Sequence, residues 1–149
     1  MSGLSTSKEF YKVMVAIDGS QHSKHAAEYA ILIAKKHESE LIVIHVLPFN
    51  STVLSLASSP RMESMRQEAK RNFEKIRLRA IKIDDTIKLR TELIASPSIV
   101  GGVVDFAEKE KVDLIVVGTK GRSGLKRLLL GSVAAGIINY AHCPVMIVK

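Results

Sequence analysis

Five apolar runs of strand length are spaced along the chain, and longer stretches with helical periodicity separate them. The runs cover residues 12–17, 41–47, 87–93, 112–117 and 145–148. Four of the runs are apolar nearly throughout, which is typical of strands that are buried on both faces of a parallel sheet. The run at 87–93 instead alternates leucine and isoleucine with charged residues, and this period of two predicts an edge strand with one wetter side.

Between these runs, apolar residues recur at steps of three or four, which predicts helices. We expect helices over about 20–38, 62–83, 98–109 and 132–140. The third of these helices contains the pair Gly101 and Gly102, and glycine is unfavourable in a helix interior. We predict the helix despite this pair. Residues 48–60 have no clear period and are bounded by prolines, so we interpret them as a long loop.

Strands that alternate with helices predict a Rossmann-like α/β fold, a single-domain three-layer sandwich with right-handed crossovers around a five-stranded parallel sheet. Placing the polar third strand at an edge and the first, second and fourth strands inside gives the order 3-2-1-4-5. The switch point then falls between the first and fourth strands, where ligands bind to such sheets. Asp18, Gly19 and Ser20 follow the first strand there, and residues 118–121 follow the fourth.

Residues 118–132, with the sequence GTKGRSGLKRLLLGS, join the fourth strand to the last helix. Gly118, Gly121 and Gly131 allow backbone N–H groups to come close to a ligand, and Ser132 directly follows the last glycine. A helix N-terminus adds further donors and a partial positive charge, so the segment predicts a cradle for an anion such as the phosphates of a nucleotide. The alternative is a flexible glycine-rich surface loop. The segment is not a P-loop, because no lysine stands between Gly131 and Ser132.

Length and composition indicate an ordinary globular domain. The 149 residues are 46% hydrophobic and 25% charged. We expect residues 1–9 to form a flexible polar tail and residues 10–149 to form one domain. No apolar run reaches the roughly 18 residues of a membrane span, and the first residues lack the apolar stretch of a signal peptide. The single cysteine, Cys143, suits a reducing compartment, so we expect a cytoplasmic protein.

The net charge of +7 would attract nucleic acid, ATP or an acidic protein. Aromatic residues make up only 5% of the chain and tryptophan is absent, so the sequence does not favour dedicated nucleic-acid binding. The basic helix at 61–83 carries Arg66, Lys70 and Arg77, and its charges form either a solvated face or a surface for nucleic acid or a protein partner. His45, His142 and Cys143 lack the spacing of a metal site, so we interpret them as core or surface residues.

The spacing Gly118-x2-Gly121-x9-Gly131-Ser132 resembles the ATP-binding signature of the universal stress protein family. The stretches VMVAIDGS, LIVIHVL and HCPVMIVK are similar to the opening, second strand and ending of that family, so the resemblance covers almost the whole chain. It implies a 3-2-1-4-5 sheet, a dimer, and binding of ATP with Mg²⁺, because all the glycines of the signature are kept.

The resemblance also implies roles for individual residues. Ala16 and Ile17 would form an apolar wall for adenine, and the backbone of Val46 would pair with its edge. Asp18 would accept from the ribose hydroxyls or hold a water on Mg²⁺. The phosphates and ribose would be approached by Gly118, Thr119, Gly121, Arg122, Gly131, Ser132 and Val133.

Each of three roles has a purely structural alternative. Asp18 is also suited to an Asx turn or to capping the following helix. Ser132 is suited to capping the last helix, and Val46 to ordinary core packing.

The apolar fifth strand should lie at the other edge of the sheet, where an exposed apolar strand invites pairing with another chain. We therefore expect a homodimer through residues 144–148, unless a local helix or loop covers them. The implied function is a nucleotide-dependent switch in the stress response. The alternative of an ATPase requires a group that positions water. Asp18 is the only candidate for that group, so turnover is expected to be absent or very slow.

Overall fold

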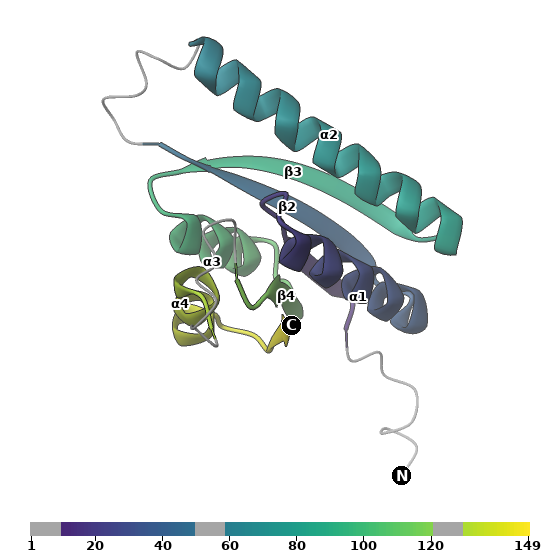
Figure 1. Cartoon of the computed structure of the whole chain (residues 1–149). Helices are drawn as coiled ribbons and strands as arrows, with labels where there is room; N and C mark the ends of the chain where they lie inside the picture. Colours follow the sequence, from purple (N-terminus) through teal and green to yellow (C-terminus); the bar gives the residue numbers. More distant parts are fainter. Residues whose placement is uncertain (1–9, 50–58, 121–129) are drawn as a thin grey trace.

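The computed structural model describes residues 10–49, 59–120 and 130–149, in which strands alternate with helices (Figure 1). The elements are β1 (Lys12–Ala16), α1 (Gln21–His37), β2 (Glu40–Pro48), α2 (Pro60–Ile83), β3 (Lys88–Ser96), α3 (Ile99–Lys109), β4 (Leu114–Gly118), α4 (Ser132–Tyr140) and β5 (Val145–Val148). The predicted tail at 1–9 and residues 50–58 of the predicted loop lie outside the described residues. In the described part of the chain, no helix has both the length and the hydropathy needed to cross a membrane.

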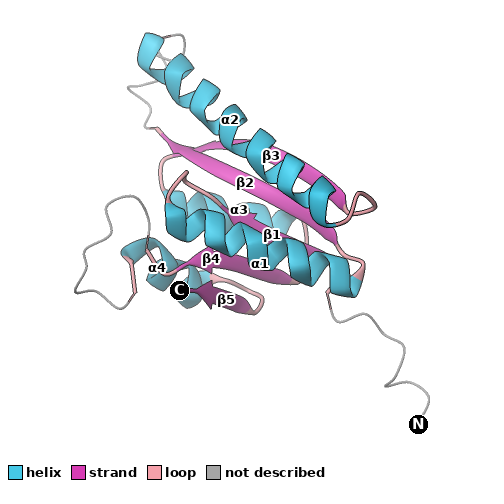
Figure 2. Ribbon diagram, turned by 45° about the vertical axis from the view of Figure 1, so that its right-hand side comes forward, coloured by secondary structure: helices cyan, strands magenta, loops and turns pink. Residues whose placement is uncertain are grey.

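The strands form one parallel sheet in the order β3-β2-β1-β4-β5, which confirms the predicted fold and topology (Figure 2). The chain leaves β1 toward β2 on one side and returns through β4 on the other. The switch point therefore lies between β1 and β4.

Helices cover both faces of the sheet. The buried side chains of α1 and α2 pack on one face with Val13 and Val15, whereas those of α3 and α4 pack on the other face with Met14 and Ile42. Successive side chains of a strand point to opposite faces. The central strands are therefore apolar throughout because each face has its own helical layer.

β3 is an edge strand and none of its side chains is fully buried, as its alternating pattern predicts. At this edge Arg90 bonds three carboxylates. Its guanidinium nitrogens lie 3.0 Å from Glu40, 3.2 Å from Glu92 and 2.5 Å from Glu110. The hydrogen bonds to Glu110 and Glu40 raise the pKa of Arg90, and the bond from Arg90 lowers the pKa of Glu110. Arg90 thus joins β2, β3 and the end of α3.

Replacing Arg90 with glutamine is expected to lower the free energy of unfolding by about 1 kcal/mol near neutral pH, because three carboxylates would then lie together without their cation. Since the folded-state pKa of Glu110 is lowered, its contribution is present above the unfolded pKa and is lost as the pH falls through the folded-state pKa. The deficit of Arg90→Gln should therefore shrink below about pH 4.

Urea unfolding near neutral pH and near pH 3 measures this difference. Arg77→Gln is the matched control, because Arg77 pairs only loosely with exposed Glu74 at 4.0 Å. A deficit of Arg90→Gln that stayed constant down to acidic pH would contradict the electrostatic explanation.

Three helices begin at a serine cap. The side chains of Ser20, Ser59 and Ser98 accept hydrogen bonds from the backbone at the third residue of α1, α2 and α3, respectively. This explains why α2 begins at Pro60, earlier than its apolar periodicity indicates, since proline is favoured at the first helical position. α4 is different, because its cap is a glycine.

Candidate functional site

Three segments of the predicted site meet at one edge of the sheet. β1 and β4 are parallel neighbours, so the turn after β1 lies beside the end of β4. The N–H of Gly131 donates to the carbonyl of Thr119 at 2.6 Å, and the N–H of Thr119 donates to the carbonyl of Val148 at 2.9 Å. The first bond holds the start of α4 next to the end of β4, and the second joins the end of β4 to the end of β5. We call residues 18–20, 118–120 and 131–133 the strand-end site.

The turn after β1 is built by Asp18. The Asp18 carboxylate accepts the N–H of Ser20 at 2.9 Å, and the backbone N–H of Asp18 donates to the hydroxyl of Ser23 at 3.3 Å. Gly19 has a φ of +84°, which favours glycine. The predicted Asx turn at Asp18 is therefore confirmed. The alternative that Asp18 caps α1 is wrong, because Ser20 provides that cap.

The start of α4 has no side-chain cap. Its capping residue is Gly131, which makes no side-chain hydrogen bond, and its first turn contains no acidic residue. Ser132 is exposed and is the first residue of the helix, so the interpretation of Ser132 as the cap is wrong. The positive end of the α4 dipole is thus not compensated by a carboxylate of its own first turn.

Gly118 and Gly131 are both needed for close packing of the backbone. A Cβ at Gly118 would lie 2.8 Å from the carbonyl oxygen of His22 in α1, and one at Gly131 would lie 3.0 Å from the carbonyl oxygen of Thr119. Neither glycine has a positive φ. These glycines therefore shape the strand-end site by letting three backbone segments approach one another.

Val46 lies where β2 extends beyond the end of β1. The carbonyl of Ile44 accepts the N–H of Ile17 at 2.9 Å, so the backbone of Ile44 faces β1. Since backbone groups alternate in direction along a strand, the N–H and C=O of Val46 face the same way, past the last pair of the β1–β2 ladder. The side chain of Val46 is buried against α3, as the packing alternative predicts. Core packing of the side chain is therefore compatible with a backbone that faces past the end of the β1–β2 ladder.

The other residues that the sequence predicted for the site do not all lie together. Ala16 packs with the α3 and α4 layer, whereas Ile17 belongs to the α1 and α2 layer, because consecutive residues point to opposite faces. Thr119 is buried beside Gly131, and Val133 is half-buried in α4. Gly121 and Arg122 lie outside the described residues.

No group of three or more histidine, cysteine, aspartate or glutamate residues suited to a metal ion occurs in the part of the chain that the structure describes. The ring of His45 makes an edge contact with Phe73. Burial raises the pKa of the Cys143 thiol, which disfavours the nucleophilic thiolate. These observations favour structural roles for both residues.

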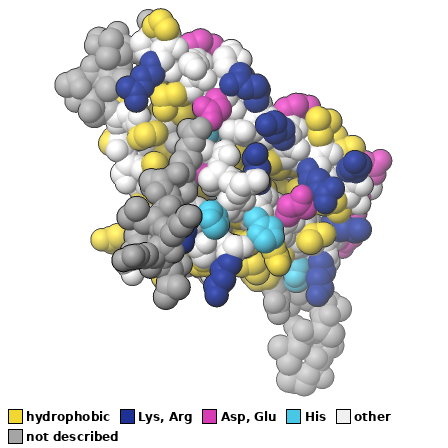
Figure 3. All heavy atoms as spheres, viewed as in Figure 1, with side chains coloured by type: hydrophobic (Ala, Val, Ile, Leu, Met, Phe, Trp, Pro, Cys, Tyr) yellow, Lys and Arg dark blue, Asp and Glu magenta, His cyan; other side chains and the backbone are white. Residues whose placement is uncertain are grey.

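The basic face of α2 is partly neutralised by ion pairs. Arg66 lies 3.7 Å from Glu63, and Arg79 lies 2.7 Å from Glu28 of α1. On the face shown in Figure 3, lysine and arginine side chains lie among acidic and apolar ones rather than forming one basic surface. This arrangement favours the solvated-face interpretation of these charges.

Sequence patterns did not single out three residues that complete the site. Ser23 supports the Asp18 turn, and Asn72 of α2 packs against Gly19. A Cβ at Gly102 would lie 2.9 Å from Val46 Cγ1, so this glycine lets α3 approach the end of β2. The contacts of Asn72 and Gly102 join elements that are distant in the sequence, whereas that of Ser23 with Asp18 spans five residues. Only the unfavourable glycine pair in α3 was a signal in the sequence.

The chain is similar to known proteins over most of its length. A family model described as the universal stress protein family matches residues 9–149. Universal stress protein MJ0531 of Methanocaldococcus jannaschii is 38% identical over 143 residues, which cover 94% of this chain and 82% of that protein. The structure of UspA from Lactobacillus plantarum has a TM-score of 0.82 at 21% identity and covers 94% of this chain and 98% of that one. A universal stress protein solved in complex with cAMP has a TM-score of 0.68 at 25% identity and covers 94% of this chain and 97% of that one.

Proposed function

This chain belongs to the universal stress protein family, and we propose that it binds ATP with Mg²⁺ at the strand-end site. The observation that carries the proposal is the start of α4. This helix N-terminus lacks a side-chain cap and is held beside the switch point of the sheet. A helix N-terminus attracts anions through its N–H groups and its dipole, so the phosphates would bind at Ser132 and Val133.

The adenosine would lie toward β2. The backbone of Val46 faces the space beyond β1 and would pair with the adenine edge. Asp18 follows β1, which lies between β2 and β4 in the sheet. The structural relative at 25% identity was solved with cAMP, another adenine nucleotide. Its bound ligand supports an adenine nucleotide as the class of ligand for this chain.

Magnesium would be held mainly by the phosphates. Mg²⁺ usually keeps several waters and takes one or two protein carboxylates together with substrate phosphates. Asp18 is the carboxylate of the strand-end site, so its side chain would be the one to contact a metal-bound water. We expect hydrolysis to be absent or very slow, which release of inorganic phosphate from Mg-ATP would test.

We further propose that nucleotide binding switches the surface that a partner recognises, and that the protein acts in the cytoplasm as a homodimer. β5 is an edge strand whose Met146 is 36% exposed, and Ile138 and Tyr140 of α4 are exposed as well. Apolar residues at an unpaired edge favour pairing with a second copy. Sedimentation equilibrium with and without Mg-ATP would detect the dimer and any effect of the nucleotide on it.

Ser132→Pro tests the phosphate site. Proline at the first helical position removes the N–H and the hydroxyl while keeping the helix, and Gly131 before it has φ −70° and ψ 163°, which suits a residue that precedes proline. We expect Ser132→Pro to weaken Mg-ATP binding by about tenfold in calorimetry, because a hydrogen bond to a charged phosphate is lost. Ser132→Ala, which keeps the N–H, should lose less.

Asp18→Asn is the companion variant for magnesium. Asparagine keeps an oxygen that can accept the Ser20 N–H but removes the charge, so Mg²⁺ should strengthen ATP binding less than it does in the wild type. Equal affinities of Ser132→Pro and the wild type would place the phosphates elsewhere. If Mg²⁺ strengthened ATP binding equally in Asp18→Asn and the wild type, Asp18 would not take part in holding the metal.

A further inference from the structure

A pocket of about 220 Å³ lies between α1 and α2, on the face of the sheet opposite to α3 and α4. Its inner surface is apolar and consists of Ile17, Ala27, Ile31 and Ile76, which are all at most 7% exposed. Ala27 presents only a methyl group to α2. The space between the two helices is therefore left open at this point.

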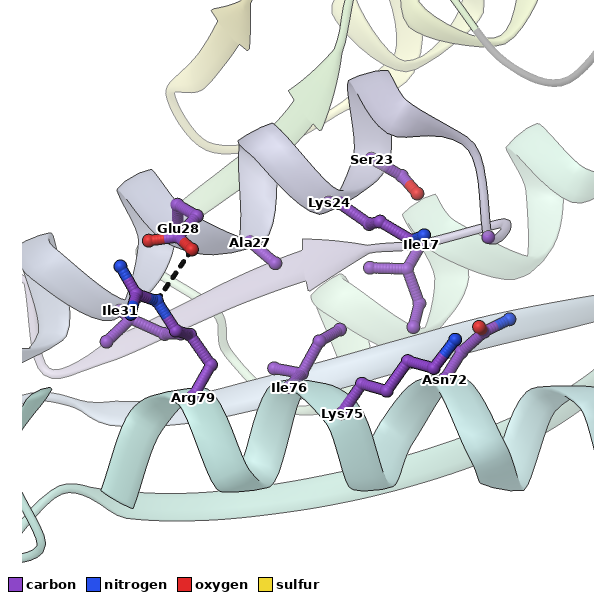
Figure 4. A pocket seen from close by; sticks show the side chains of 11 residues that line it. Ile17, Ser23, Lys24, Ala27, Glu28, Ile31, Asn72, Lys75, Ile76 and Arg79 are labelled. Atoms are coloured by element: carbon purple, nitrogen blue, oxygen red, sulfur yellow. Dashed lines mark hydrogen bonds and ion pairs between the residues drawn. The ribbon is translucent and has the colours of Figure 1, made fainter. Parts of the chain in front are cut away.

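The two ends of the pocket differ in charge (Figure 4). At one end the ion pair between Arg79 Nε and Glu28 Oε1, 2.7 Å apart, neutralises both side chains. At the other end Lys24 of α1 and Lys75 of α2 reach toward each other beside Asn72. The pocket thus has an apolar interior, a neutral end and a cationic end.

Asn72 provides an independent sign of a missing partner. Its Nδ2 atom is buried and has no hydrogen-bond partner among the described residues. A buried donor without a partner is costly and needs an explanation. An anionic ligand at the cationic end would supply an acceptor. Glu68 lies near Gly19 and Asn72 but does not line the pocket.

We propose that the pocket between α1 and α2 binds a small carboxylate with an unbranched apolar chain. The carboxylate would lie between Lys24 and Lys75 and accept from Asn72, and the chain would lie along the isoleucines toward Arg79. The volume is that of about seven liquid waters, which is room for a chain of about six to eight carbons. This proposal does not depend on nucleotide binding.

Octanoate is the probe, and calorimetric titration of the full chain is the measurement. We expect a dissociation constant on the order of 0.1 mM. Affinity should rise about fourfold per methylene from butanoate to octanoate. Octanol and octylammonium, which have the same chain without the negative charge, should bind at least about tenfold more weakly. Absence of octanoate binding, or equal binding of octanol, would overturn the proposal.

Two variants locate the ligand. Lys75→Glu should weaken octanoate binding about tenfold, whereas Lys70→Glu, an exposed lysine of α2 that does not line the pocket, should leave it unchanged. Ala27→Leu should abolish binding by filling the pocket. In methyl-labelled protein, octanoate should shift the signals of Ile17, Ile31 and Ile76 but not that of Ile42 on the other face. Equal losses in Lys70→Glu and Lys75→Glu, or shifts at Ile42 alone, would contradict the assignment.

The pocket adjoins the proposed nucleotide site, because Gly19 of the strand-end site and Ile17 also line the pocket, and titration in the presence of Mg-ATP tests whether the two ligands bind independently. Octanoate binding that persists at saturating Mg-ATP supports a separate pocket, whereas competitive displacement overturns it. Should the protein fail to bind ATP, the octanoate titrations and their variants would still decide this proposal by themselves.

Discussion

Replacing Gly118 with alanine is expected to lower the free energy of unfolding by about 2–3 kcal/mol, the upper part of the usual range for overpacking. The added Cβ would lie 2.8 Å from the carbonyl oxygen of His22 and 2.9 Å from its carbonyl carbon and Cβ. Two of these atoms are backbone atoms of α1, so no side-chain rotation relieves the contact. α1 must move away from β4, and the Asp18 turn, which leads into α1, must move with it.

Urea unfolding of Gly118→Ala beside the wild type measures the loss. Mg-ATP affinity of the variant, measured where both proteins are folded, should fall as well, because the strand-end site is built on the contact between β4 and α1. A variant of unchanged stability would show that α1 shifts at little cost, and would contradict the structural explanation for this glycine.

The neighbouring glycines of α3 are expected to respond to alanine with opposite signs. A Cβ at Gly102 would lie 2.9 Å from Val46 Cγ1 and 3.0 Å from Ser96 Cβ, whereas one at Gly101 would make only an ordinary contact with Ser98 at 3.4 Å. We expect Gly102→Ala to destabilise the protein by about 2 kcal/mol, because α3 must lift from the ends of β2 and β3. Gly101→Ala should stabilise it by about 0.5 kcal/mol, because alanine favours the helix.

This pair is its own control, since both substitutions add the same methyl group to the same helix. Thermal or urea unfolding of the two variants gives the comparison directly. If both variants were stabilised, the packing between α3 and Val46 would accommodate the added methyl group of Gly102→Ala. The close packing that positions the end of β2 would then not depend on Gly102.

Much of the fold could be predicted because its signals are local. The apolar runs of β1, β2 and β4 indicated strands with two covered faces, and the alternation around Arg90 placed β3 at an edge. The Asx turn at Asp18 was predictable for the same reason, because its hydrogen bond joins residues two apart. The start of α2 was misplaced, since the cap at Ser59 precedes the apolar residues that show the helical period.

The site was predicted less completely, because its determinants are contacts between distant segments. The sequence suggested Ser132 as the cap of α4, but the helix begins at Ser132 itself and its cap is Gly131, whose N–H is bound by Thr119. No pattern along the chain shows that the missing Cβ of Gly118 faces His22. Nor does any pattern show that the Asn72 amide packs against Gly19 without a hydrogen-bond partner in the described structure.

The sequence by itself determined the order of strands and helices, the covered and exposed strands and the position of the switch point. These follow from hydrophobic periodicity and turn residues, which act over a few neighbouring residues. Only the tertiary structure decided which glycines allow backbone contact, which way the backbone of Val46 faces and where a pocket opens between α1 and α2. Those features depend on strand register and on the distance between packed elements, which are set by the whole core.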